Sequence, residues 1–174
     1  MTRICRGIQG PFRRRTLSSD AMVLFEDVRN KPGKHKNIHA YCQQQGIEIV
    51  RQCLNVGDYQ IANKGDIIVD TKMSVGELSQ DIFHSHERFR NELERAQRFG
   101  IKLIILTEET LPGGLLENWR SPIGRDGLPL FKFDPMTLKK AMLTMQDRYG
   151  CLFRFCDGRS TGRVLLEYLK GERE

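Results

Sequence analysis

The sequence predicts an α/β domain in which helices flank a central mixed sheet. Apolar runs of strand length alternate with stretches of helical period over most of the 174 residues, and glycine or proline often separates them. Such alternation is typical of layered α/β architectures. The length suits one compact domain with a real core. We expect this single domain to cover residues 21–174, after a flexible basic arm at residues 1–20.

The first half of the domain predicts four strands and one helix. The apolar run at 22–25 ends in charged residues, as a buried strand does, and Gly46 stands where a helix ends. Two further short apolar runs flank a polar Asn-Lys-Gly turn, which is the pattern of a hairpin. The expected elements are a strand at 22–25, a helix at 34–45, and strands at 47–54, 59–62 and 67–72.

The second half predicts helices with clear start signals. Ser74 and Glu77 have the spacing of a capping box, and Asp134 before a proline is a typical N-cap. Glycines and prolines make the segment 112–133 mostly loop. The expected elements are helices from 74, at 86–99, from 134 and from 160 or 161 to 169, with strands at 101–106 and 151–156.

The charge balance favours a polyanionic partner. Twenty-eight Lys and Arg face 22 Asp and Glu, which gives a formal net charge of +6. Neutralising phosphates with such a surplus releases counterions and favours nucleic-acid binding. The arginine triplet at 13–15 belongs to the basic arm, which we interpret as a solvated tail more readily than as a DNA-binding device.

The cysteines and the apolar runs indicate an intracellular, cytoplasmic protein. Five cysteines form an odd set without a C-x-x-C pair, which argues against a disulfide framework and a zinc knuckle. No apolar run reaches the roughly 20 residues that span a bilayer, so no membrane partner is expected. The sequence also lacks a Walker motif or a nucleotide-binding glycine loop, which argues against a nucleotide cofactor. The cysteines in apolar surroundings, expected to be buried free thiols, are Cys42, Cys53, Cys151 and Cys156.

The chemistry is concentrated in two neighbouring predicted strands. Asp58 opens the strand at 59–62, and the triplet Asp70-Thr71-Lys72 ends the strand at 67–72. Asp70 and Lys72 are two residues apart on a strand and therefore point to the same face. If the two strands pair antiparallel, Asp58 reaches the same end of the sheet. Two carboxylates there would bind a hard cation such as Mg²⁺, and the lysine would orient or deprotonate a water molecule.

Either motif alone also fits an ordinary surface turn or an ion pair on an edge strand, but their order and surroundings resemble a known family. From Phe25 to Glu109 the chain resembles the nuclease domain of the XPF family, a branch of the PD-(D/E)xK superfamily. Its elements are a strand ending in D-x-R-E, then L-x-V-G-D-Y, then E-R-K-x-x-x-D, an R-[FLY] helix element and a strand ending in an acid. The corresponding residues here are Asp27-Val28-Arg29, Leu54–Tyr59, Asp70-Thr71-Lys72, Arg88-Phe89 and Leu106-Thr107-Glu108.

The resemblance has three departures. Asn30 stands for the acid of D-x-R-E, and Thr71 stands for the arginine of E-R-K. Gly76 occupies the position of the last family aspartate, with Glu77 one residue later. Glu77 is therefore either a replacement metal ligand or simply the capping-box residue, and the sequence favours neither.

The resemblance implies a restriction-endonuclease-like fold with a metal and DNA site. The metal ion, Mg²⁺ or Mn²⁺, would be held by Asp58, Asp70 and the Thr71 carbonyl, assisted by Asp27 or Glu77. Lys72 would position the water, and Arg88 would steady the scissile phosphate. The other candidate phosphate contacts are Arg29, Lys31, Lys34 and Lys36. For the three lysines, a solvated surface position is an equally good explanation.

We therefore expect a metal-dependent DNA endonuclease that acts on branched or flapped DNA, as a homodimer or a heterodimer. The alternative is a catalytically silent, nuclease-like subunit that binds DNA or serves as a scaffold. A third option is a nuclease for intact duplex or RNA. A zinc site at His35 and His39, four apart on a predicted helix, lacks a third ligand.

Overall fold

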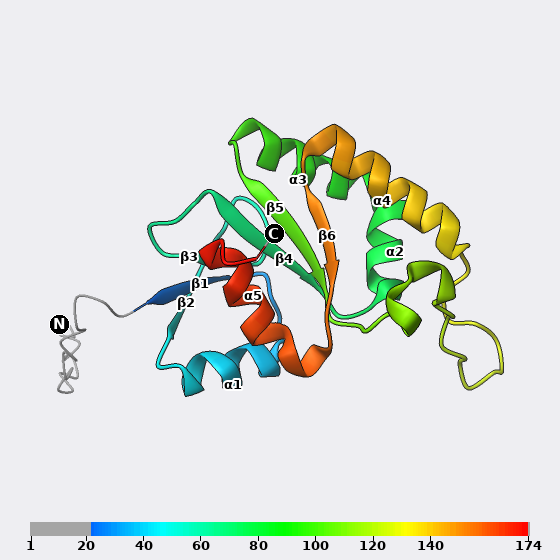
Figure 1. Ribbon diagram of the computed structural model, residues 1–174, viewed down its shortest axis with the longest axis horizontal. Coiled ribbons are helices and arrows are strands. Elements are labelled where there is room, and N and C mark those ends of the chain that lie inside the picture. Colours follow the sequence, from blue (N-terminus) through cyan, green and yellow to red (C-terminus); the bar gives the residue numbers. More distant parts are fainter. Residues whose placement is uncertain (1–21, 174) are drawn as a thin grey trace, which may run out of the picture.

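The computed structural model describes residues 22–173, which form a mixed sheet with helices on both faces (Figure 1). The strand order is β2-β1-β3-β4-β5-β6, with β3 antiparallel to both of its neighbours and all other pairs parallel. The strands are β1 (Val23–Asp27), β2 (Glu48–Gln52), β3 (Tyr59–Ile61), β4 (Ile67–Lys72), β5 (Lys102–Thr107) and β6 (Leu152–Phe155). The predicted α/β class with a mixed central sheet is confirmed. The expected arm at 1–20 lies outside the described residues.

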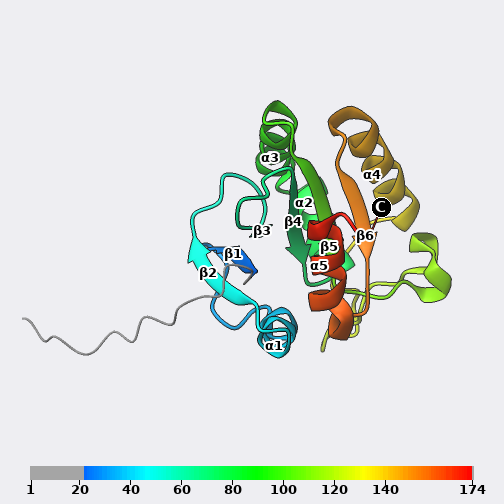
Figure 2. The same ribbon diagram turned by 60° about the vertical axis from the view of Figure 1, so that its left-hand side comes forward.

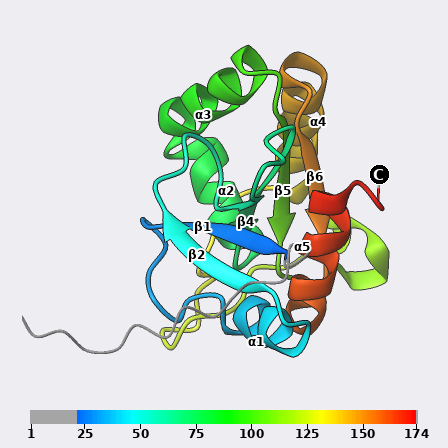
Figure 3. The same cartoon turned by 90° about the vertical axis from the view of Figure 1, so that its left-hand side faces the viewer.

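The helices form two layers around the sheet. Figures 2 and 3 show α1 and α5 on one side and α2, α3 and α4 on the other. Each layer closes its own apolar core against the sheet, as a sheet covered on both faces requires. The helices are α1 (Lys36–Gln44), α2 (Val75–Phe83), α3 (His86–Arg98), α4 (Pro135–Tyr149) and α5 (Thr161–Lys170), with short 3₁₀ turns at Pro112–Gly114, Leu116–Asn118 and Gly158–Ser160.

Strands β4 and β5 form the centre of the fold and carry residues of the candidate site. Both are apolar runs that are buried over most of their length, because each face of the sheet is covered by helices. Their parallel pairing brings the carboxyl end of β4 beside that of β5, with Lys72 opposite Thr107. The polar residues at these strand ends therefore lie at one edge of the sheet.

The predicted caps at Ser74 and Asp134 are confirmed, whereas the helix expected from 34 begins at Lys36 and Ser160 forms no side-chain cap. The Ser74 hydroxyl accepts a hydrogen bond from the Glu77 N–H at 3.1 Å, as in a capping box. The Asp134 carboxylate accepts hydrogen bonds from the backbone N–H groups of Met136 and Thr137. These contacts satisfy backbone donors that have no partner inside a helix.

One expectation about the cysteines is wrong. Cys53 is exposed because it follows β2, which lies at the edge of the sheet, whereas Cys42 and Cys151 are buried as expected. Cys156 is partly buried. No helix among residues 22–173 is both long enough and apolar enough to span a bilayer.

Candidate active site

The antiparallel pairing of β3 and β4 brings Asp58 to the end of β4. Tyr59 stands opposite Val69, and the Asp58 N–H donates to the Val69 carbonyl at 2.9 Å. The Asp58 Oδ2 atom accepts two hydrogen bonds from Thr71, one from its N–H at 2.9 Å and one from its hydroxyl at 2.5 Å. The carboxylate that opens one strand is thus fixed against the acid-x-lysine end of the next.

Lys72 lies between two carboxylates. Its Nζ atom is 2.7 Å from Asp70 Oδ2 and 2.8 Å from Asp81 Oδ2, and its side chain is only 9% exposed. Burial alone would lower the pKa of Lys72, but the two carboxylates outweigh it and raise that pKa above its ordinary value. The lysine therefore stays protonated, and suits positioning a water and neutralising charge better than accepting a proton.

Asp70 is held in a strained electrostatic environment. Burial raises its pKa to about 6, and the nearby charges of Asp58 and Asp81 act in the same direction against the stabilising charge of Lys72. A buried carboxylate with a raised pKa and like charges around it is typical of functional sites. A divalent cation beside Asp70 would relieve this repulsion.

These groups line one polar cavity of about 260 Å³. Glu92, from α3, reaches it and accepts a hydrogen bond from the Gly57 N–H at 2.9 Å. Burial, and then the charge of Asp70, raise the pKa of Glu92. The cavity lining is mainly charged: Arg29, Asn30, Lys34, Gly57, Asp58, Asp70, Thr71, Lys72, Glu77, Asp81, Arg88, Glu92 and Arg95.

Asp81, Glu92 and Arg95 are charged cavity residues that sequence reasoning missed. Arg88 Nη2 donates to Asp81 Oδ1 at 2.8 Å, so its partner is Asp81 on α2 and not Glu92, which stands four residues along its own helix. A usable signal existed, because Glu77 and Asp81 are four apart and so lie on the same face of a helix. Which face of α2 meets the site depends on tertiary packing.

Asp27 is buried beside the cavity but does not line it. Its two carboxylate oxygens accept hydrogen bonds from the Arg29 guanidinium at 2.7 and 2.8 Å, and Oδ2 also accepts the Leu54 N–H. Burial opposes its ionisation, yet these hydrogen bonds hold its pKa below the ordinary value. Asp27 therefore braces Arg29, which does line the cavity, instead of facing the expected metal position.

Glu77 is engaged on the rim of the cavity. Its carboxylate accepts the Met73 N–H at 2.7 Å and the Lys34 ammonium at 3.0 Å, in addition to the cap at its own N–H. The capping alternative for Glu77 is thus present in the structure. Lys34 lines the cavity, whereas Lys31 and Lys36 are exposed outside it.

The two predicted helix histidines serve other partners. His39 Nε2 lies 3.0 Å from Glu26 Oε1. His35 is buried, with Nδ1 2.9 Å from Glu108 Oε1 and Nε2 3.3 Å from the Thr71 hydroxyl. Glu108 thus contacts His35, His35 contacts Thr71, and Thr71 holds the Asp58 carboxylate in place.

The donor set fits a magnesium-like ion held by few protein ligands. Among residues 22–173 no three His, Cys, Asp or Glu side chains are placed to hold one metal ion together. Mg²⁺ commonly binds through one or two carboxylates, with water and substrate phosphate completing its shell. Asp58 and Asp70 both line the cavity and could supply such a pair, and Thr71 stands between Asp70 and Lys72 in the sequence.

Comparison with known proteins identifies the domain family. The model of the ERCC4 domain matches residues 27–167. The chain belongs to the ERCC4 domain family. That domain is the XPF-type nuclease domain, so the resemblance in the sequence is confirmed.

Solved XPF structures share the fold. XPF from Aeropyrum pernix is 19% identical, with a TM-score of 0.59, and the same protein in complex with DNA gives 0.60. Each match covers 86% of this chain and 64% of that one, so this chain spans less than two thirds of the length of these relatives. A comparison with curated proteins finds no match.

Proposed function

We propose that this ERCC4-domain chain is a metal-dependent endonuclease that hydrolyses phosphodiester bonds in branched or flapped DNA. The observation that carries the proposal is the convergence of Asp58, Asp70 and Lys72 in one charged cavity. The complex of its structural neighbour XPF with DNA supports DNA as the substrate. A net charge of +6 suits a polyanion.

In this proposal Asp58 and Asp70 hold Mg²⁺ or Mn²⁺ together with the Thr71 carbonyl. The bound ion would supply Lewis-acid stabilisation of the phosphate and an activated water molecule. Thr71 fixes the Asp58 carboxylate through two hydrogen bonds, which limits the rearrangement that metal binding requires. Asp27 and Glu77 act indirectly, by bracing Arg29 and Lys34.

Lys72 acts as a cation close to the reacting phosphate. Its ammonium is already held by Asp70 and Asp81. Lys72 therefore orients a water molecule or a phosphate oxygen without a further loss of side-chain conformational entropy. Arg88 is 78% exposed and keeps guanidinium donors beyond its bond to Asp81. It is therefore placed to contact the scissile phosphate from the rim, with Arg29 and Lys34 as further phosphate contacts.

The test is cleavage of labelled duplex, flap, fork, four-way junction and single-stranded DNA with Mg²⁺ or Mn²⁺. Wild type should cut a branched substrate. Lys72→Ala and Asp70→Asn should each lose about a hundredfold or more in rate. Lys64→Ala, which removes an exposed lysine from the turn between β3 and β4, is the matched control and should retain full activity.

Two outcomes separate the alternatives. Metal-dependent cutting that survives Asp70→Asn would refute this site. No cutting of any substrate, together with tight binding of branched DNA in a shift assay, would favour the silent DNA-binding subunit. A dimer, with itself or with a second protein, is the expected working form, and light scattering with and without DNA measures it.

A further inference from the structure

A hairpin with exposed apolar side chains beside its turn projects from the loop between β5 and α4. We define it as residues 120–132, joined by a bridge between Ile123 and Pro129 and by the Gly124 N–H donating to the Leu128 carbonyl at 2.8 Å. Ile123 is 62% exposed, Leu128 55% and Leu130 60%. Grouped exposed apolar residues mark an interaction site more often than scattered single ones do.

The base of the hairpin is firmly anchored. Trp119 is 3% exposed, donates from Nε1 to Glu109 Oε1 at 2.6 Å and stacks on Phe133 with ring centroids 5.0 Å apart. The ring of Phe131 packs directly against Gly76 at the start of α2, where a Cβ atom would collide with it. The exposed apolar side chains of the hairpin are thus carried on a packed base.

A cavity of about 520 Å³ lies between this base and α2. Its lining combines aromatic rings with polar groups that can bond the edges of bases: Ser79, Gln80, Phe83, His84, Leu130, Phe131, Lys132, Phe133, Asp134 and Thr137. On the same helix, Glu77 and Asp81 line the candidate active site. Two cavities of different character therefore flank α2, one catalytic and charged, the other aromatic.

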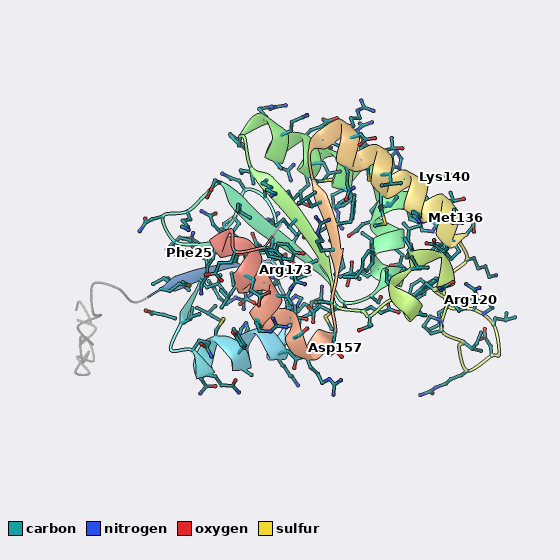
Figure 4. All side chains as sticks on the ribbon, viewed as in Figure 1. Phe25, Arg120, Met136, Lys140, Asp157 and Arg173 are labelled. Carbon is teal, nitrogen blue, oxygen red and sulfur yellow. The ribbon has the colours of Figure 1, made fainter. Side chains whose placement is uncertain are left out.

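The hairpin is basic as well as apolar. Arg120 donates to the backbone carbonyls of Glu117 and Trp119, which leaves its charge unneutralised. Within residues 22–173, neither Arg125 nor Lys132 forms an ion pair. In Figure 4 Arg120 lies in this loop, whereas Met136 and Lys140 lie on the adjoining α4, outside the hairpin. Cations around aromatic and apolar groups complement the phosphates and base faces of a single strand.

We propose that the 120–132 hairpin and the cavity behind it hold an unpaired strand of branched DNA. This inference rests on the proposed action on DNA and adds the part of the substrate that is recognised. The exposed side chains of Ile123, Leu128 and Leu130 beside the turn stack against the last paired bases, in the way that wedges of Ile, Leu and Pro act elsewhere. An unpaired base enters the aromatic cavity, and Lys132 and Arg125 follow its phosphates.

The test measures binding in EDTA, which withholds the metal ion and prevents cutting of the substrate. A fork carries 2-aminopurine at the unpaired nucleotide next to the branch, and a plain duplex of the same length is compared by anisotropy. Wild type should bind the fork about tenfold more tightly than the duplex and change the 2-aminopurine fluorescence on binding. Combined Ile123→Ser and Leu130→Ser, and separately Lys132→Ala, should remove most of this preference and leave duplex affinity nearly unchanged.

Matched controls lie on α4. Leu143→Ser removes an apolar side chain that is 51% exposed, and Lys140→Ala removes an exposed lysine; neither lines the cavity. Both should bind the fork as wild type does. If the hairpin variants keep full fork preference, the inference is overturned. It is also overturned if the variants act only by changing the mass measured by light scattering, since the patch would then join copies of the chain. Because the experiment measures binding and not cutting, its result can be interpreted even if the protein proves to have no nuclease activity.

Discussion

At the scale of single residues, Lys72 governs the candidate site. Its buried ammonium is shared by Asp70 and Asp81, and these contacts hold two carboxylates together that would otherwise repel. The cost falls on Asp70, whose pKa is raised to about 6 mainly by burial. The negative charge of the carboxylates in the site is therefore not fully neutralised by the folded chain alone.

Asp70→Asn should stabilise the folded protein at neutral pH in the absence of metal ions. Folded Asp70 holds its proton up to a pKa of about 6, against 3.8 in the unfolded chain. Its contribution to the free energy of unfolding is thus full below about pH 4 and is lost as the pH rises through 6. Two pKa units correspond to about 3 kcal/mol. Urea unfolding of both proteins should show a gap that opens between pH 4 and 7.

The control for this measurement is Asp66→Asn, which neutralises an exposed carboxylate in the turn before β4. It should track wild type at every pH. An Asp70→Asn variant whose stability runs parallel to wild type from pH 4 to 8 would contradict the raised pKa.

Asp81→Asn should raise the Mg²⁺ concentration needed for half-maximal cleavage. Without the Asp81 charge, the Lys72 ammonium turns wholly to Asp70 and competes with the metal ion for that carboxylate. The expected change is about tenfold, the size of a charge-assisted hydrogen bond. Metal titrations of cleavage measure it, with Asp147→Asn on the exposed surface of α4 as the control. An unchanged metal dependence would remove Asp81 from this role.

Residue spacing predicted part of the site and could not predict the rest. Asp70 and Lys72 follow from the two-residue period of a strand, and Asp58 follows from antiparallel pairing with it. Asp81 and Glu92 stand on helices, and their position depends on how those helices rotate and dock against the sheet. The helical period shows which residues share a face of a helix but not which element that face packs against.

At the scale of elements, the turn that precedes β3 aims Asp58 at β4. Gly57 has φ +62°, and a Cβ atom there would lie 2.6 Å from Ile68 Cγ2 and 3.1 Å from the Val69 carbonyl oxygen. A side chain is therefore excluded by both backbone conformation and space. Periodicity predicted the strands on either side, but the order β2-β1-β3-β4 was not contained in any local pattern.

Gly57→Ala should destabilise the fold and misplace Asp58. The positive φ and the collision together should cost about 2–4 kcal/mol in the free energy of unfolding. Gly46→Ala is the matched control, because Gly46 has φ +67° and open space around its Cβ position. It should cost about 1 kcal/mol, and only the Gly57 variant should lose cleavage at temperatures where both are folded. Equal costs in urea unfolding would contradict the packing argument.

At the scale of the whole molecule, charge is distributed unevenly around the site. Arg29, Lys34, Arg88 and Arg95 line the cavity near its carboxylates, so the cavity itself carries no surplus of positive charge although the chain carries a net +6. Composition predicted the sign of the net charge but not the meeting of cations and carboxylates in one cavity. That meeting required the fold, because the four cations come from the β1–α1 connection and from α3.

DNA affinity should fall steeply with salt, and the rim cations should set part of the slope. Arg88→Ala and Lys34→Ala should each reduce the slope of log affinity against log salt by about 1, since each removes one phosphate contact. Lys102→Ala, which removes an exposed lysine of β5, should leave the slope unchanged. Anisotropy titrations between about 50 and 300 mM salt measure the slopes. Identical slopes for all three variants would place the DNA elsewhere.

The contact between Gly76 and Phe131 links the active-site end of α2 to the 120–132 hairpin. Gly76 stands where the XPF pattern has its last aspartate, and the Phe131 ring occupies the space of a Cβ atom there. An aspartate at position 76 would therefore displace the Phe131 ring and loosen the base of the hairpin. The acid of the family pattern and the packed position of Phe131 thus compete for the same space.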